Sequence, residues 1–349
     1  MDLLDRTLRE QAAAIAAGDA DAGAVLEAAL ERIEDRNAAV NAIVETFPEE
    51  SRRMLAEAPR GPLYGVPVAI KDEWPLPWRA ERLGAAQHIG PAPRPGVSGP
   101  YRALRDAGAV IVGVANMHEY GSGSTGHISA FGPARNPWNT DRLPGGSSSG
   151  PAAAVAVRMV AGAVGADGVG SIRYPAAYCG LTGLKPTFGR SAMEGHHIAH
   201  VTTTVVSGPM CADAADCRLL SGALFGEPLE SGEPSGLRIG VVRDPHWSDS
   251  RPEVREACEE ALVALRDATG GEVREVTIDG GRHAHVASVL IGSTEEIDAT
   301  TPEKIAELGD EVSVIAHALM KYRLLIPAAT MERAKRARAL VRRSLAALF

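Results

Sequence analysis

Cysteine is scarce in this chain, with four residues among 349. Cys179, Cys211, Cys217 and Cys258 show no C-x-x-C spacing and are too few for a disulfide framework. We expect all four to be reduced. Reduced thiols are typical of cytoplasmic proteins, so cytoplasmic residence is predicted.

Long apolar runs are also missing. The longest, residues 151–166, is interrupted by Arg158 and falls short of the roughly 20 residues that a membrane-spanning helix needs. The first residues, "MDLLDRTLREQAAAIAAGD", have neither the basic start nor the unbroken apolar segment of a signal peptide. We therefore expect no membrane partner.

Positive charge is not in excess. The 36 Lys and Arg residues are outnumbered by 44 Asp and Glu residues, which gives a formal net charge of −8. The sequence has no Lys/Arg patch interleaved with aromatic residues, of the kind that binding to a phosphate backbone would require. The composition therefore predicts that nucleic acid is not a partner.

Apolar residues are plentiful, at 45% of the chain, and are sufficient for a large core. Two continuous apolar runs, residues 64–71 ("YGVPVAIK") and 109–116 ("AVIVGVAN"), predict buried strands, and residues 101–108 predict a helix between them. This alternation is typical of parallel pairing in an α/β sheet. Further elements are predicted as helices over 3–35 (two helices), 151–161, 254–268, 302–323 and 330–349, and as strands over 237–242 and 272–278.

Two glycine-rich segments match known motifs only formally. "GSSSG", residues 146–150, has the G-x-S-x-G pattern that would make Ser148 a nucleophile, but "NTDRLPGG" precedes it where a strand is required. "GADGVG", residues 165–170, lacks the glycine spacing of a dinucleotide-binding loop. Neither motif predicts a site.

Histidines occur in two groups that suggest metal ligands, but no carboxylate pattern accompanies them. We interpret them as loop or surface histidines and expect neither a metal nor a cofactor. They are His196, His197, His200, His283 and His285.

A lysine and two serines form a further candidate site. Lys71 ends the predicted strand 64–71; on its own it is best explained as a surface lysine with a buried stem. If it is desolvated, however, its neutral amine becomes available as a base. Ser147 and Ser171 stand in loops whose glycines let backbone N–H groups approach a ligand closely.

These residues carry a resemblance to the amidase signature family. "GPLYGVPVAIKD", "AGAVIVGVANMHEY", "FGPARNPWNTDRLPGGSSSGPAAAVA" and "GADGVGSIRYPAAYCGLTGLKPTFGR" follow one another in the family's order and spacing, with 24 positions between Ser147 and Ser171. The resemblance is close over roughly residues 5–225 and loose beyond. It implies a fold of the α/β class, an α/β/α sandwich around a large mixed β-sheet.

The resemblance also implies a mechanism. Ser171 is the nucleophile, Ser147 is a bridging serine that follows a cis peptide bond, and Lys71 is the base. The activity implied is hydrolysis of a small carboxamide to a carboxylate and ammonia or an amine, through an acyl-serine intermediate. Two further groups are implied: an oxyanion hole of Gly168, Val169 and Gly170, and Ser148, Asp167 and Arg173, which hold the two loops together.

The chain departs from the family pattern in two ways. Val169 and Ser149 stand where glycine is usual, so both loops carry a bulkier residue. The pattern also continues for some tens of residues past Phe349, so we expect the C-terminal part of the fold to be lacking. Two alternative functions stay open. One is a glutaminase subunit of a tRNA-dependent amidotransferase, which shares the signature, and the other is a catalytically impaired homologue, which these two departures suggest.

The resemblance predicts one domain over residues 1–349. Within it, residues 1–60 are N-terminal helices, 61–225 are the catalytic core, and 226–349 are peripheral helices and strands. The expected partner is a small-molecule amide, and a homo-oligomer is one option for the quaternary state.

Overall fold

The computed structural model describes residues 2–86, 96–196, 202–232, 234–243, 249–295, 301–307 and 312–349. By its internal contacts the chain divides into two units. The first comprises Met1–Leu229 and Glu295–Leu325, and the second comprises Glu230–Thr294 and Ile326–Phe349. The subdivision of a single domain at residues 60 and 225 stays a prediction.

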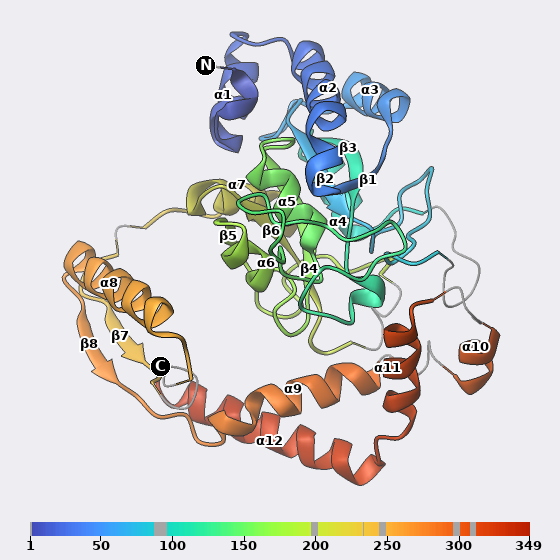
Figure 1. The fold of residues 1–349 in the computed structure, drawn as a ribbon. Coiled ribbons are helices and arrows are strands. Elements are labelled where there is room, and N and C mark those ends of the chain that lie inside the picture. Colours follow the sequence, from blue (N-terminus) through green and yellow to red (C-terminus); the bar gives the residue numbers. More distant parts are fainter. Residues whose placement is uncertain are drawn as a thin grey trace. The chain divides into compact units, whose positions relative to one another are not determined.

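The first unit contains a six-stranded mixed sheet with the strand order β1-β3-β2-β4-β6-β5 (Figure 1). β2 runs parallel to both β3 and β4, while the outer pairs β1–β3, β4–β6 and β5–β6 are antiparallel. The prediction of an α/β fold with a mixed sheet is therefore confirmed. The strands are β1 Ile43–Thr46, β2 Pro67–Lys71, β3 Val110–Ala115, β4 Gly162–Asp167, β5 Thr182–Gly183 and β6 Val206–Cys211.

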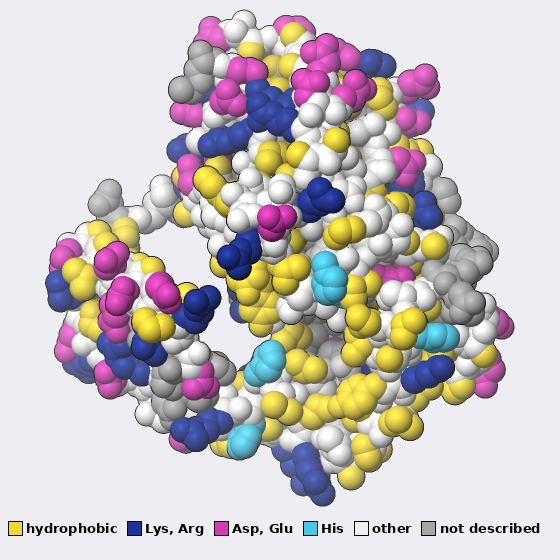
Figure 2. All heavy atoms as spheres, in the orientation of Figure 1, with side chains coloured by type: hydrophobic (Ala, Val, Ile, Leu, Met, Phe, Trp, Pro, Cys, Tyr) yellow, Lys and Arg dark blue, Asp and Glu magenta, His cyan; other side chains and the backbone are white. Residues whose placement is uncertain are grey.

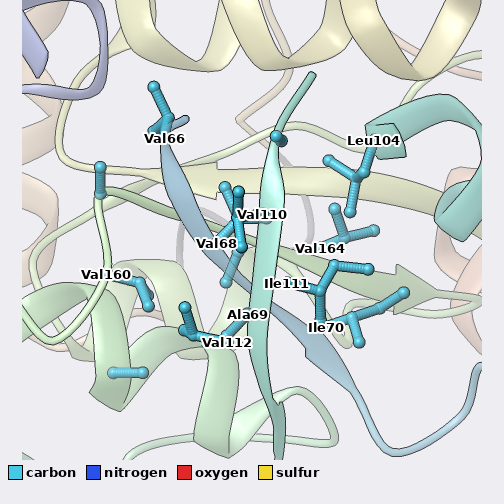
Figure 3. Close-up of a cluster of buried hydrophobic side chains, with 14 of the residues drawn as sticks. Val66, Val68, Ala69, Ile70, Leu104, Val110, Ile111, Val112, Val160 and Val164 are labelled. Carbon is cyan, nitrogen blue, oxygen red and sulfur yellow. The ribbon is translucent and has the colours of Figure 1, made fainter. Parts of the chain in front are cut away.

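The central strands are buried along their whole length, as continuous apolar runs predict for a sheet covered on both faces. Figure 3 shows side chains of β2 and β3 clustered with Leu104 of α4 and with Val160, which precedes β4. α5 packs against β2, β3 and β4, whereas α7 packs against β6 and also contacts α4.

Among the described helices of this unit, α1, α2 and α7 begin at a side-chain cap and end at a residue in the left-handed conformation. α1 begins with a capping box, in which Thr7 and Glu10 satisfy each other's backbone N–H groups, and it ends at Gly18 with a left-handed φ of 79°. The helices are η1 Leu3–Asp5, α1 Leu8–Ala17, α2 Ala22–Val40, α3 Pro48–Glu57, α4 Gly99–Asp106, η2 Glu119–Gly121, α5 Ser149–Ala156, α6 Arg173–Tyr178, α7 Ala214–Phe225, α10 Pro302–Glu307 and α11 Val314–Leu324.

A buried carboxylate joins the start of the chain to α7. Asp216 is fully buried, and its two carboxylate oxygens accept from the backbone N–H groups of Leu8 (2.8 Å) and Arg9 (3.1 Å). Arg9 also forms an ion pair with Asp216 at 2.9 Å. The first turn of α1 is therefore fixed by a residue more than 200 positions away.

α5 is shorter than predicted. The helix expected over 151–161 ends at Ala156, and Arg158 adopts a φ of 60°, a left-handed conformation that a helix cannot contain. The chain then turns into β4.

In its described residues, the second unit contains a parallel two-stranded sheet and three helices. Its core includes Ala287 and Ile291 of α9 and Ala334 of α12. The predicted helices 254–268 and 330–349 correspond to α8 and α12. The elements are β7 Arg238–Val241, α8 Pro252–Thr269, β8 Glu272–Glu275, α9 Gly281–Glu295 and α12 Ala328–Ala346.

Charges of both signs are mixed over the visible face of α1, α2 and α3 (Figure 2). None of the helices in the described ranges is long and apolar enough to cross a membrane.

Candidate active site

Lys71 is buried at the end of β2, with a relative exposure of 1%. Its Nζ donates to Ser147 Oγ at 2.9 Å, and Ser147 is also 1% exposed. Lys71 is therefore not the snorkelling surface lysine that its sequence position alone would suggest. The structure brings together the predicted base and the predicted bridging serine.

The loop before α5 places Ser147. The Gly146–Ser147 peptide bond is cis, as the family resemblance implied. Gly146 is enclosed so tightly that a Cβ there would lie 2.8 Å from the backbone N of Gly126 and 2.9 Å from the carbonyl oxygen of Gly123. Only glycine fits at this position. The carbonyl oxygen of Ser147 in turn accepts from His118 N at 3.0 Å.

Asp167, the last residue of β4, organises the loop that carries Ser171. Its buried carboxylate accepts from Gly170 N at 2.7 Å and from Ile172 N at 3.2 Å. Arg173 adds two donors, Nε and Nη2, each at 3.0 Å. Burial acts to raise the pKa of Asp167, but the hydrogen bonds and charge of Arg173 outweigh it and hold that pKa below its usual value.

Ser171 is half-buried, whereas Lys71 and Ser147 are closed off from solvent. The Ser171 carbonyl accepts from Ser148 N at 3.1 Å, so the two serine loops lie side by side. In the described part of the chain, no hydrogen bond joins Ser171 Oγ to Ser147 Oγ. The loops are adjacent, and the partly exposed serine is the one predicted to meet substrate.

Ser148 lies where the nucleophile-elbow motif would need an exposed serine. Its side chain is instead fully buried, and its Oγ donates to the carbonyl oxygen of Ala166 at 3.2 Å. This arrangement ties the α5 loop to β4 and gives Ser148 no access to a substrate.

The predicted oxyanion hole lies in the loop that Asp167 organises. The N–H of Gly170 already donates to Asp167 Oδ1 at 2.7 Å, and the oxyanion hole of Gly168, Val169 and Gly170 stays a prediction. Position 170 requires glycine, because its φ is 137° and a Cβ there would lie 2.3 Å from the Tyr174 ring. Val169 is not among the described non-glycine residues with positive φ, so valine causes no such strain.

Two residues that the sequence analysis did not assign to this site complete the buried cluster. Glu73 Oε2 lies 2.5 Å from Lys71 Nζ, and Glu73 Oε1 lies 2.8 Å from His196 Nε2. The only sequence signal for Glu73 is an acid two positions after the candidate lysine. His196 was predicted as a loop or surface histidine; it is 4% exposed, because it packs on Trp74 and binds Glu73.

His118 borders the same cluster. Burial, followed by the charges of His127 and Lys71, lowers the pKa of His118 to about 4. Its Nδ1 accepts from Gly126 N at 3.3 Å. His118 is therefore a neutral, structural neighbour of Ser147 at physiological pH.

The histidines show no metal-binding arrangement where they are described. Within the described ranges, no group of three or more His, Cys, Asp or Glu side chains is placed to hold a metal ion. His283 and His285 are exposed on α9, and His197 and His200 lie outside the described residues.

The chain is similar in sequence to known proteins. A family model described as Amidase matches residues 24–345. The A subunit of the glutamyl-tRNA(Gln) amidotransferase of Alkalilimnicola ehrlichii is 36% identical over 319 residues, covering 83% of this chain and 64% of that protein. The protein of the same name from Thermobifida fusca is 37% identical over 324 residues, covering 84% and 64%. The matches thus span about 64% of the length of these relatives.

Solved structures are also similar. A crystal structure described as an amidase superimposes with a TM-score of 0.87 at 30% identity, covering 98% of this chain and 79% of that one. The native peptide amidase from Stenotrophomonas maltophilia gives a TM-score of 0.76 at 25% identity, covering 95% and 78%.

The prediction that nucleic acid is not a partner is wrong on this comparison. Relatives of this chain bear the name of an amidotransferase that acts on glutamyl-tRNA(Gln). The prediction failed because net charge averages over the whole chain, and that average does not exclude a reaction carried on a tRNA.

Proposed function

Because the chain belongs to the amidase family, we propose that it cleaves the C–N bond of a small carboxamide, with Ser171 as nucleophile. The observation that carries the proposal is the buried hydrogen bond from Lys71 Nζ to Ser147 Oγ, 2.9 Å long. A lysine can act as a base only in its neutral form, and removal from water favours that form over the ammonium. The Ser147 hydroxyl can then relay a proton to Lys71 from a nucleophile that the lysine does not reach itself.

In the proposed first step, Ser171 Oγ attacks the amide carbonyl carbon and passes its proton to Ser147 Oγ. Ser147 in turn gives its own proton to neutral Lys71. The developing oxyanion is met by the N–H groups of Gly168 and Val169; one such donor is typically worth about 10² to 10³ in rate.

In the second step, the same relay runs in reverse. Lys71 returns the proton through Ser147 to the leaving nitrogen, and ammonia or an amine departs. Water then attacks the acyl-Ser171 ester by the same route and releases the carboxylate. The Asp167–Arg173 pair holds the Ser171 loop in place during both steps.

The compartment proposed for this reaction is the cytoplasm. Its support is the set of free thiols, of which Cys179, Cys211 and Cys217 are buried.

A second function is favoured by the curated relatives, which bear the name of the A subunit of a glutamyl-tRNA(Gln) amidotransferase. In that role the same serine would release ammonia from an amide donor for a tRNA-dependent reaction. Ammonia release that rises when charged tRNA and further protein components are added would favour this function over free-standing hydrolysis.

The proposal is tested by covalent labelling with a serine-reactive fluorophosphonate, which requires no knowledge of the substrate. We expect a single labelled peptide containing Ser171, and no label in Ser171→Ala. Ser235→Ala, which changes an exposed serine outside the site, is the matched control and should label like the wild type. Label on Ser148 would support the nucleophile-elbow mechanism, and a folded protein that takes no label would be a noncatalytic homologue.

A further inference from the structure

Glu73 is a buried acid that the proposed mechanism leaves without a task. Its side chain is 7% exposed, and its Oε2 lies 2.5 Å from Nζ of Lys71. The turn after β2 fixes this approach, because the backbone N–H groups of Glu73 (2.7 Å) and Trp74 (3.3 Å) both donate to the Lys71 carbonyl. The carboxylate is therefore folded back onto the lysine by local backbone geometry.

His196 fixes the other oxygen of the same carboxylate. Its Nε2 lies 2.8 Å from Glu73 Oε1, and its ring packs on Trp74 with 4.8 Å between ring centroids. Gly121 lies against both the acid and the relay: a Cβ there would be 3.8 Å from Glu73 Oε1 and 3.7 Å from Ser147 Oγ. Glu73 thus borders the reacting groups and is held in a single orientation.

The pairing creates a chemical problem for the lysine. As an ammonium, Lys71 cannot accept a proton, and a carboxylate beside it favours the ammonium form. The pair as a whole is neutral, however, and a transfer of one proton across the short contact leaves an amine and a carboxylic acid with no change in net charge. Desolvation favours such neutral forms over separated charges.

We propose that Glu73 is a positioning residue that takes the proton of Lys71, so that a buried ion pair supplies the neutral amine. This inference rests on the proposed function. Lys71 gives one N–H proton to Glu73 Oε2. When Ser171 attacks, the Ser171 proton moves to Ser147 and the Ser147 proton moves to Lys71, which leaves an ammonium beside a carboxylic acid. The extra proton leaves with the departing nitrogen, and the pair returns to its starting state.

The other charged groups near this pair have partners or are neutral. Asp72 faces away and binds Arg79, with 2.6 Å between Oδ1 and Nη1. Glu119 accepts from Ser313 N at 3.1 Å. His118, with its pKa near 4, borders Lys71 from the segment that follows β3, and His127 packs against His118. His196 binds Glu73 itself, with 2.8 Å between Nε2 and Oε1.

The test is the pH dependence of fluorophosphonate inactivation, measured for the wild type, for Glu73→Gln and for a control. In the wild type, the active Lys71–Glu73 pair shares one transferable proton. The inactivation rate therefore falls at low pH only when the pair binds a second proton. In E73Q, Lys71 has to lose its proton to solvent, so we expect the acidic limb of the profile to move to higher pH and the rate on that limb to fall by at least about tenfold. Glu27→Gln, an exposed acid of α2 paired with Arg52, makes the same chemical change and should follow the wild type.

Each other result overturns the inference. An acidic limb that moves to lower pH would mean that Glu73 only stabilises the ammonium form, and an unmoved limb would mean that it only packs. If E73Q does not fold, Glu73→Asp is measured, and its shorter carboxylate should shift the limb in the same direction by less; an unshifted profile is again a contradiction. If the wild type takes no label at Ser171, the proposed function fails, which is a separate and recognisable outcome.

Discussion

The backbone N–H of Ser148 donates to the carbonyl oxygen of Ser171 with 3.1 Å between nitrogen and oxygen. This bond crosses between the loop after β4 and the loop before α5. Ser148 directly follows the predicted bridging serine, Ser147, so the bond links the loop of that serine to the predicted nucleophile, Ser171. The positions of the two serines therefore depend on each other.

Ser171→Ala and Ser147→Ala should differ in severity. Without Ser171 no acyl ester forms, so amide hydrolysis should fall to background. Without Ser147 a water can take the place of the bridging hydroxyl part of the time, and we expect kcat/KM to fall by about 10² to 10⁴. Steady-state kinetics on one amide checks both variants. A wild-type rate in Ser147→Ala would reduce this serine to a turn residue.

Lys71→Met should destabilise the protein as well as inactivate it. The change leaves the buried Glu73 carboxylate without its ammonium partner, a situation that typically costs about 3 to 5 kcal/mol in the free energy of unfolding. Adding Glu73→Gln removes the unpaired charge, so the double variant should be more stable than Lys71→Met alone. Urea unfolding of the wild type, both single variants and the double variant measures the coupling. Additive effects would mean that the two side chains do not interact.

Val169→Gly tests whether the bulkier residue slows catalysis. Because Val169 does not have a positive φ, the glycine relieves no backbone strain, and any gain has to come from space beside the reacting carbonyl. We expect acylation of Ser171 to be faster by up to about tenfold, which corresponds to about 1.4 kcal/mol of transition-state stabilisation. Burst rates of the two proteins with a small ester provide the measurement. An equal or slower burst would show that the valine is already accommodated.

His118→Gln should change how stability depends on pH. In the folded state the pKa of His118 is lowered from 6.5 to about 4, so between these values the unfolded chain binds the proton and the folded chain does not. Stability is therefore fully present above pH 6.5 and is lost as the pH falls toward 4, by about 3 kcal/mol for this group.

In His118→Gln, the free energy of unfolding should fall less between pH 7 and pH 4.5 than it does in the wild type. Urea unfolding at several pH values measures the slope. The exposed His285→Gln on α9 is the control and should keep the wild-type slope. Parallel curves for His118→Gln and the wild type would contradict the assignment.

Part of the site was predictable because its chemistry is local in sequence. Lys71 ends a strand that its apolar run already indicates, and Ser147 lies in a loop whose glycines signal close packing. Glu73 and His196 were not predictable in the same way, because they are 123 positions apart and only the tertiary fold brings them together. The hydrogen bond from the Gly170 N–H to Asp167 likewise depends on where the Asp167 carboxylate points.

The fold shows the same limit. β3 was predicted from its continuous run of β-branched residues, but β4, "GAVGAD", was not, because small residues carry little strand preference of their own. β4 exists because it pairs with β2 on one side and β6 on the other. Such pairing is a property of the assembled sheet, and a single segment does not encode it.

The contact between Asp216 and the first turn of α1 also bears on the order in which the chain folds. Its hydrogen bonds join residues 207 and 208 positions apart, so closing this loop carries a large entropic cost that only the assembled sheet can offset. These two hydrogen bonds therefore form only after α7 has been made. The turn that begins α1 is fixed by a residue that the ribosome adds 208 positions after Leu8.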